Sequence, residues 1–141
     1  MTIIVTDRGF AADDFARPIH PLEGVEALKD GEGIEIGPAD DPGALIPLLG
    51  RIGLIRIRFP VFADGRGFSH ARDLRRCGYA GRLRAAGHVL ADQYAMCRRS
   101  GFDEVEIDEA LAARQPQDQW LARANWRDHW YQARLRAPLC A

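Results

Sequence analysis

The hydrophobic pattern of the chain becomes repetitive from about residue 33 onward. Short apolar segments with the alternation or β-rich composition of strands are each followed by a segment with helical features. The expected strands cover residues 33–37, 53–59, 82–87 and 104–107, and the expected helices cover residues 41–49, 69–76, 88–100 and 109–114. Consecutive β-α units predict parallel strands joined by right-handed crossovers. We therefore expect an α/β fold with a mainly parallel sheet, either half of a (β/α) barrel or a small open sheet of flavodoxin type.

The two ends of the chain depart from this repeat. After a candidate strand at residues 2–5, prolines and glycines interrupt the sequence and predict an irregular arm. Residues 118–135 are compatible with a helix that carries aromatic side chains. With 141 residues the chain fits one structural domain, which we divide into an amino-terminal strand and arm (1–32), a β-α core (33–117) and a carboxyl-terminal helix and tail (118–141). Half of a barrel would expose two sheet edges, which the amino-terminal strand, the terminal aromatic helix or a second subunit must cover, and we expect a homo-oligomer, such as a homodimer, or another tightly bound partner.

Two arginines alternate with apolar residues in the expected strand 53–59. Arg56 and Arg58 fall on the same face, because successive side chains of a strand point to opposite faces. Burying unpaired arginines on that face would be costly. The pattern predicts that the face is partly wet, or that the arginines meet carboxylates or a ligand.

Composition and charge narrow the classes of function. A formal net charge of -1 gives no overall field that would hold nucleic acid or an anionic membrane. No apolar run approaches membrane-spanning length, and the first residues lack the features of a signal peptide, so we expect a cytoplasmic protein. The three cysteines have no metal-ligand spacing, and no metal site is predicted. No motif for a flavin, nicotinamide, haem or iron–sulfur cofactor is recognisable, so the cofactor is left unassigned.

The loop after the expected strand 53–59 has the groups best suited to binding a ligand, because parallel sheets bind ligands at the carboxyl ends of their strands. Its candidate ligand-binding residues are Asp64, Gly65, Arg66, Gly67 and Ser69. The glycines permit unusual backbone angles and close approach, the arginine offers a fork of donors, and a helix capped by Ser69 presents free N–H groups. These features suit a small oxyanion or a nucleotide phosphate. Asp64 is expected to order the loop or to hold Arg66 by a salt bridge, and a well-capped tight turn explains the pattern equally well.

The exit of the expected strand 82–87 supplies further candidates. Arg84 and Gln93 are expected to join the same ligand-binding face, with Asp92 as the candidate catalytic acid or base. His88 stands one helical turn before Asp92 and could form an acid–base pair with it. A solvated His88 and an Asp92 that complements the helix dipole explain the spacing more simply.

Three motifs occur in order along this part of the chain: F-P-V-F-A-D-G-R-G-F-S at 59–69, G-Y-A-G-R-L-R-A-A-G-H-V-L-A-D-Q at 78–93 and G-F-D at 101–103. In composition and spacing they resemble a bacterial family of unknown function that is commonly labelled as an oxidoreductase of sulfite reduction. The resemblance extends over roughly residues 33–131. It departs at His88, where the family often has aspartate, and this departure weighs against a His–Asp catalytic pair.

The resemblance implies a role in sulfur assimilation. Genes of this family tend to lie beside those of the sulfite/nitrite reductase haemoprotein and of adenylyl-sulfate reduction. We expect an auxiliary protein of assimilatory sulfate/sulfite reduction that binds a small oxyanion or a nucleotide phosphate, and an oxidoreductase activity is implied by the family label alone. One alternative is a non-catalytic adaptor that docks on the reductase haemoprotein through the aromatic carboxyl-terminal helix. A weaker alternative is a domain that uses an external flavin, whose phosphate would occupy the same loop.

Overall fold

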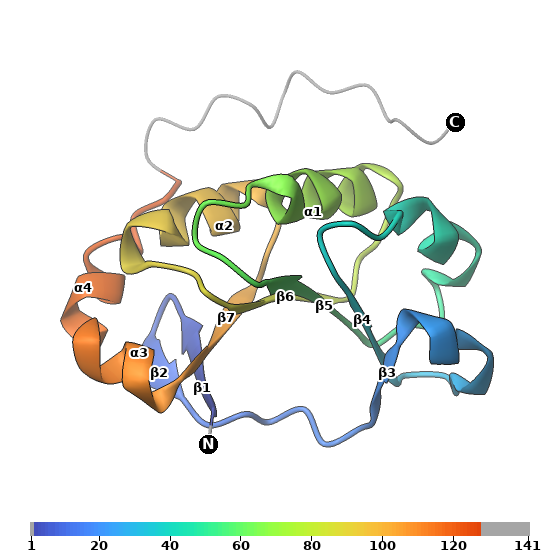
Figure 1. Cartoon of the computed structure of the whole chain (residues 1–141), viewed down its shortest axis with the longest axis horizontal. Coiled ribbons are helices and arrows are strands. Elements are labelled where there is room, and N and C mark those ends of the chain that lie inside the picture. The colour runs from blue at the N-terminus through green and yellow to red at the C-terminus, as the bar shows by residue number, and fades with distance from the viewer. Residues whose placement is uncertain (1, 128–141) are drawn as a thin grey trace.

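A computed structural model describes residues 2–127 and shows a mixed α/β domain built on one seven-stranded sheet (Figure 1). The strand order is β2-β1-β7-β6-β5-β4-β3. The strands are β1 (Thr2–Thr6), β2 (Gly9–Ala11), β3 (Ile19–Pro21), β4 (Gly33–Ile36), β5 (Leu54–Phe59), β6 (Arg82–Gly87) and β7 (Glu104–Asp108). Strands β3 to β7 are parallel neighbours in chain order, whereas β1 pairs antiparallel with both β7 and β2. The predicted α/β class and mainly parallel sheet are therefore confirmed.

Helices connect the parallel strands as the sequence pattern predicts. The α-helices are α1 (Arg66–Arg76), α2 (Tyr94–Ser100), α3 (Glu109–Arg114) and α4 (Gln117–Leu121), and the 3-10 helices are η1 (Leu22–Ala27), η2 (Pro42–Leu48) and η3 (Ala91–Gln93). Strands β4 to β7 match the four predicted strands to within one residue at each end. The three-residue strands β2 and β3 lie in the segment predicted to be irregular.

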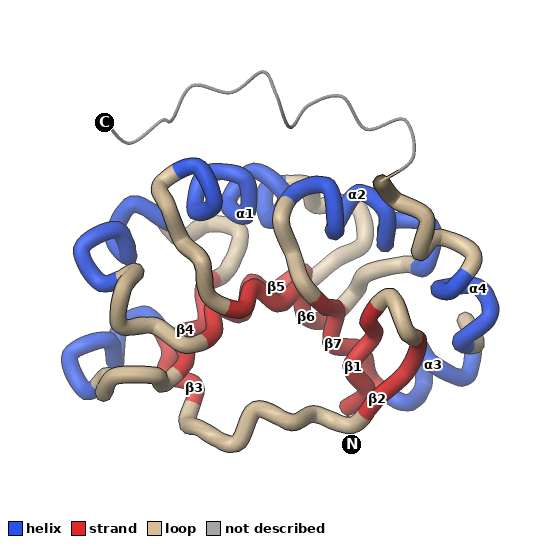
Figure 2. Tube along the Cα trace, turned by 180° about the vertical axis from the view of Figure 1, so that it is seen from behind, coloured by secondary structure: helices blue, strands red, loops and turns tan. Residues whose placement is uncertain are grey.

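The sheet is curved rather than flat. In Figure 2 its strands form an arch, with α1 and α2 on the outer side and the segment between β2 and β3 crossing the open side. The amino-terminal strand β1 covers the free edge of β7, which was one of the expected ways to protect an edge. The arch corresponds to the half-barrel form of the prediction.

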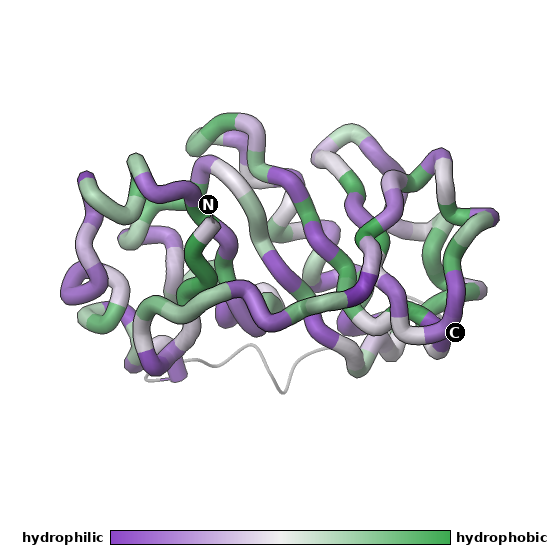
Figure 3. The backbone as a smooth tube through the Cα atoms, turned by 90° about the horizontal axis from the view of Figure 1, so that it is seen from below, coloured by the Kyte–Doolittle hydropathy of each residue, from purple (hydrophilic) through white to green (hydrophobic). Residues whose placement is uncertain are grey.

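The hydrophobic core lies between the outer face of the sheet and the helices. Alternate residues of β4, β5, β6 and β7 are apolar and buried there, such as Ile55 and Ile57 in β5, and Figure 3 shows the resulting alternation of hydropathy along the strands. The ring of Phe59 lies 5.0 Å from that of Phe68 on α1 and 5.9 Å from that of Phe102, measured between centroids. These contacts fix α1, and with it the loop that precedes the helix, against the carboxyl end of β5.

The predicted carboxyl-terminal helix is represented by the short helix α4, and Trp130 and the rest of residues 128–141 lie outside the described residues. Trp120 and Trp126 are both buried in the core cluster. None of the helices between residues 2 and 127 combines the length and the apolar character needed to cross a membrane.

Candidate functional site

The loop at the carboxyl end of β5 contains Asp64, which contacts the first residue of the helix that follows. Helix α1 begins at Arg66, so Ser69 lies in its first turns and is not the capping residue that the sequence pattern predicted. The backbone N–H of Arg66 donates to Oδ1 of Asp64 at 3.1 Å. An aspartate two residues before the helix therefore satisfies one of the N–H groups that the first turn leaves without an intrahelical partner.

Asp64 also holds the side chain of Arg66, as predicted. Nη2 of Arg66 donates to Oδ2 at 2.7 Å, and Nε donates to Oδ1 at 3.1 Å. These side-chain hydrogen bonds, followed by the backbone one, lower the pKa of Asp64 to about 2. The Arg66 side chain remains 60% exposed, and within residues 2–127 its hydrogen bonds to Asp64 use Nε and Nη2 and leave Nη1 open. One edge of the guanidinium is thus fixed while the other faces solvent.

The two glycines of the loop do not provide the unusual backbone angles that the sequence pattern predicted. Gly65 has φ -88°, and Gly67 lies inside α1 and is not among the glycines with positive φ, so neither provides an unusual backbone angle. A Cβ atom on Gly67 would lie 2.5 Å from Cζ of Phe59. Gly67 is therefore required for close packing of α1 on the ring, whereas the nearest atom to a Cβ on Gly65 would be 4.0 Å away, on Phe68.

Gln93 joins this loop, as predicted, by fixing its backbone. Its Nε2 donates to the carbonyl of Phe62 at 2.9 Å, and its Oε1 accepts from the N–H of Leu90 at 2.8 Å. His88 provides a second connection, because its Nδ1 donates to the carbonyl of Pro60 at 2.6 Å and its ring lies 5.1 Å from that of Phe62. The exits of β5 and β6 are thus tied into one unit.

The structure does not assemble the His88–Asp92 pair. Nδ1 of His88 is bound to a backbone carbonyl, and the carboxylate of Asp92 accepts from Nη2 of Arg123 at 2.8 Å with 80% of its side chain exposed. A solvated carboxylate paired with an arginine has no environment that would tune it for proton transfer. The geometry gives no support to Asp92 as the catalytic acid or base.

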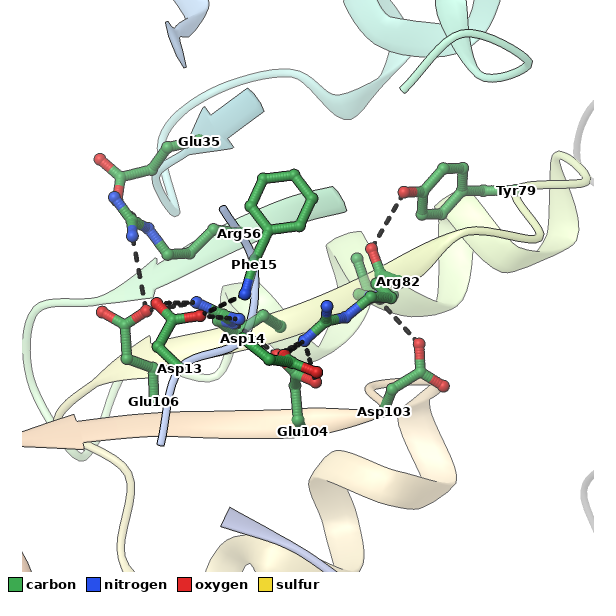
Figure 4. Close-up of polar contacts among 12 residues, drawn as sticks. Asp13, Asp14, Phe15, Glu35, Arg56, Tyr79, Arg82, Asp103, Glu104 and Glu106 are labelled. Atoms are coloured by element: carbon green, nitrogen blue, oxygen red, sulfur yellow. Dashed lines mark hydrogen bonds and ion pairs between the residues drawn. The ribbon is translucent and has the colours of Figure 1, made fainter. Parts of the chain in front are cut away.

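Arg84 lies on the inner face of the sheet, away from the loop at the carboxyl ends where we expected it, and its partners Asp13, Glu104 and Glu106 are labelled in Figure 4. It is fully buried and is surrounded by carboxylates. Its Nε donates to Oε2 of Glu104 at 2.6 Å, its Nη1 donates to Oε1 of Glu106 at 2.8 Å, and both terminal nitrogens donate to Asp13. Together these contacts hold the pKa of Arg84 above its ordinary value, although burial by itself would lower it. Its role in this structure is to bind carboxylates of the same chain.

Arg84 belongs to a row of charges that runs straight across four strands. Glu35, Arg56, Arg84 and Glu104 are successive register partners on β4, β5, β6 and β7. The prediction that Arg56 and Arg58 would meet carboxylates is confirmed, because Nε of Arg56 donates to Glu35 at 2.7 Å and Nη1 of Arg58 donates to the same carboxylate at 3.2 Å.

The glutamates of this row were not among the sequence candidates. The signal that could have identified them is the charge at alternate positions in β5, β6 and β7, together with the single charged residue Glu35 in β4. Opposite charges on neighbouring parallel strands predict cross-strand pairs wherever the register places them side by side.

Two hollows open at the carboxyl ends of the strands. One of about 350 Å³ lies over β3, β4 and β5 and is lined by Pro21, Leu22, Glu23, Glu35, Asp40 and Arg58. The other, of about 190 Å³, is lined by residues of β1, β6, β7 and α3 and includes His88 and Arg114. Among residues 2–127, no group of three or more His, Cys, Asp or Glu side chains could hold a metal ion.

Comparison with protein-family models gives a match over most of the chain. The family described as "Bacterial protein of unknown function (DUF934)" matches residues 33–140. No curated protein and no solved structure matches the chain. The matched segment contains the 59–69 loop, Gln93 and the four-strand row of charges, and the amino-terminal arm precedes it.

Proposed function

The chain belongs to the DUF934 family of bacterial proteins of unknown function, and we propose that it is an auxiliary protein of assimilatory sulfate/sulfite reduction that binds a small sulfur oxyanion at the start of α1. The observation that carries this proposal is the state of Arg66. Its guanidinium is held by Asp64 along one edge, is 60% exposed, and stands at the first residue of a helix.

This arrangement suits an oxyanion for two physical reasons. A guanidinium that is already fixed loses less conformational entropy when it donates hydrogen bonds to a planar or tetrahedral anion. The first turn of α1 adds backbone N–H groups and the positive end of the helix dipole. Both contributions act at the carboxyl end of a parallel strand, where this class of fold binds ligands.

Asp64 lowers the affinity that we expect this site to have for an anion. Its carboxylate neutralises part of the charge of Arg66, and the exposed site is screened by water and salt. We therefore expect weak binding, in the millimolar range, and a preference for anions of charge -2 over chloride. Gln93 acts as a positioning residue, because it fixes the Phe62 carbonyl two residues before Asp64.

The identity of the anion is proposed from the resemblance to the sulfite-reduction family. Sulfite, sulfate and adenylyl sulfate all carry oxygen atoms on a pyramidal or tetrahedral sulfur, and an arginine and a helix start can bind oxygens in this arrangement. A nucleotide phosphate has the same recognition chemistry, and adenylyl sulfate carries both groups.

The adaptor alternative draws less support from the structure. In that alternative the aromatic carboxyl-terminal segment contacts the partner protein. Trp126 of this segment is buried against its own chain: its Nε1 donates to Asp7, and its ring lies 4.6 Å from the guanidinium carbon of Arg98. A side chain committed to the core is a poor anchor for a partner protein.

Thermal unfolding tests the proposal. We expect 10 mM sulfite, sulfate or adenylyl sulfate to raise the melting temperature by about 2–5 °C relative to chloride at equal ionic strength. Arg66→Ala should abolish the increase. Arg76→Ala is the matched control, because it removes the same charge from the far end of α1, where the side chain makes only a 4.0 Å contact with Asp73. Absence of a shift with all three anions, or an equal loss in both variants, would contradict the proposal.

A further inference from the structure

The segment between β2 and β3 crosses the inner face of the sheet and is held there by side chains. Residues 12–18 are exposed except for a half-buried Phe15, and they span the open side of the arch in Figure 2. Among the described residues, one backbone hydrogen bond outside the regular elements holds this segment, from the N–H of Gly33 to the carbonyl of Pro18 at 2.8 Å. We call residues 12–18 the strap.

Asp13 on the strap occupies Arg84 as an anionic ligand would. Its two carboxylate oxygens accept from Nη1 and Nη2 of Arg84 at 3.1 and 3.0 Å, which is the fork geometry by which arginine binds oxyanions (Figure 4). Asp14 accepts from Nη2 of Arg82 at 2.8 Å, and the ring of Phe15 lies 5.7 Å from the guanidinium carbon of Arg82. The strap thus contacts the inner face mainly at two neighbouring arginines of β6.

The aspartates of the strap offset the positive charge of the arginines on this face. Ion pairs join four arginines and three glutamates of β4 to β7 into the inner-face network: Glu35, Arg56, Arg58, Arg82, Arg84, Glu104 and Glu106. Four positive and three negative side chains give the network a charge of +1. The two aspartates of the strap change it to -1.

Removal of the strap would leave no arginine without a carboxylate. Arg84 would keep Glu104 and Glu106, and Arg82 would keep Glu104. The carboxylates that would leave are already accessible to water, with 77% of the Asp14 side chain and 32% of the Asp13 side chain exposed. The Asp14–Arg82 pair is exposed on the aspartate side and contributes little to stability, so the strap is held chiefly by the contact of Asp13 with the buried guanidinium of Arg84.

We propose that Arg82 and Arg84 form a second anion-binding site, specific for doubly charged tetrahedral oxyanions of the sulfate and phosphate class, and that the strap blocks this site until such an anion displaces Asp13 and Asp14. Displacement would free one N–H each on Nη1 and Nη2 of Arg84 and on Nη2 of Arg82, while Nη1 of Arg84 still donates to Glu106 and Nη2 of Arg82 still donates to Glu104. The family match contains the whole network and begins after the strap, which agrees with a site to which the strap is an addition. This site is separate from the one at α1, and the inference does not rest on the proposed function.

Sulfate titration of the full chain tests this inference, with the arginine Nε–H signals followed by NMR at constant ionic strength. The variant Asp13→Asn/Asp14→Asn should bind sulfate at Arg82 and Arg84 at least tenfold more tightly than the wild type. The matched control is Asp30→Asn/Asp92→Asn, because both of its aspartates are exposed and each accepts from an arginine at 2.8 Å outside the network. An equal gain in the control, or no gain in the strap variant, would overturn the inference.

A measurement on the wild type removes any dependence on the folding of the variant. The N–H of Gly33 on β4 donates to the carbonyl of Pro18 at the end of the strap at 2.8 Å, so its hydrogen exchange reports whether the strap is seated. Sulfate should accelerate that exchange, and chloride at the same ionic strength should not. Sulfate-induced changes confined to Arg66 and α1 would contradict the second site while leaving the proposed function intact.

Discussion

Arg56 on β5 and Arg84 on β6 are direct register partners, and Oε1 of Glu106 accepts a hydrogen bond from Nη1 of each, at 3.4 and 2.8 Å. Two like charges opposite one another would destabilise neighbouring strands without such a bridge. The inner face of this half-barrel is therefore stabilised by ion pairs, whereas the outer face is stabilised by apolar packing.

Removal of Arg84 should cost more stability than removal of any exposed arginine of the network. Arg84→Met leaves Glu104, Glu106 and Asp13 without a shared buried partner, and we expect a loss of about 3–5 kcal/mol in the free energy of unfolding. Arg58→Met, at a half-exposed position on the same face, should cost at most about 1 kcal/mol. Urea denaturation of both variants measures the difference, and equal losses would show that the network does not depend on Arg84.

The two glycines around Arg66 should respond differently to alanine. Gly67→Ala places a methyl group against the ring of Phe59 and should destabilise by about 1–3 kcal/mol. Gly65→Ala meets nothing closer than 4.0 Å and should range from neutral to about 1 kcal/mol more stable. The two melting curves decide between packing and backbone freedom as the reason for these glycines, since a backbone requirement would make Gly65→Ala the more harmful change.

The Asp64–Arg66 pair should make stability depend on acidic pH. The pKa of Asp64 falls from its ordinary value of 3.8 to about 2 in the folded chain, because it accepts hydrogen bonds from the Arg66 side chain and backbone. A lowered folded pKa means that the stabilisation is fully present above pH 3.8 and is lost as pH falls from 3.8 towards 2. Asp64→Asn should reduce this part of the pH dependence. An unchanged acid unfolding profile in that variant would exclude a stabilising role for the pair.

Gln93 and Asp92 are neighbours whose replacement should have unequal effects. Gln93→Ala removes two hydrogen bonds to the backbone and should cost about 1–3 kcal/mol, because each bond contributes about 0.5–1.5 kcal/mol. It should also weaken the anion-induced rise in melting temperature by loosening the loop. Asp92→Asn, on a solvated side chain, should change neither quantity measurably, and a loss of the anion effect in that variant would restore Asp92 as a site residue.

The strands β4 to β7 could be predicted because their apolar alternation and the glycines, prolines and caps around them are local signals. Asp108 illustrates such a local signal, since it directly precedes the expected helix 109–114 and its side chain caps α3 by accepting from the N–H of Leu111. Strand β3 could not be predicted in the same way, because its three residues are defined by pairing with β4, as in the register of Ile19 with Gly33. Such pairing depends on the tertiary fold and leaves no period in the sequence.

The candidate site was predicted in part for similar reasons. The loop and the Asp64–Arg66 salt bridge follow from residues two positions apart, so sequence alone suffices for them. The helix start was placed at Ser69 because serine is a good cap, but α1 begins three residues earlier, at Arg66, whose N–H donates to the side chain of Asp64. The partners of Arg84 come from β7 and from the strap 71 residues away, and no local pattern could select them.

The most direct test of oxyanion binding at α1 is an NMR titration of the full chain with sulfite and with sulfate, with chloride at equal ionic strength as the reference. The Nε–H of Arg66 and the amide signals of Gly67 and Phe68 should shift together and saturate in the millimolar range, and Arg66→Ala should remove the amide shifts. If those signals stay unchanged while the anions are added, the start of α1 is not an anion-binding site.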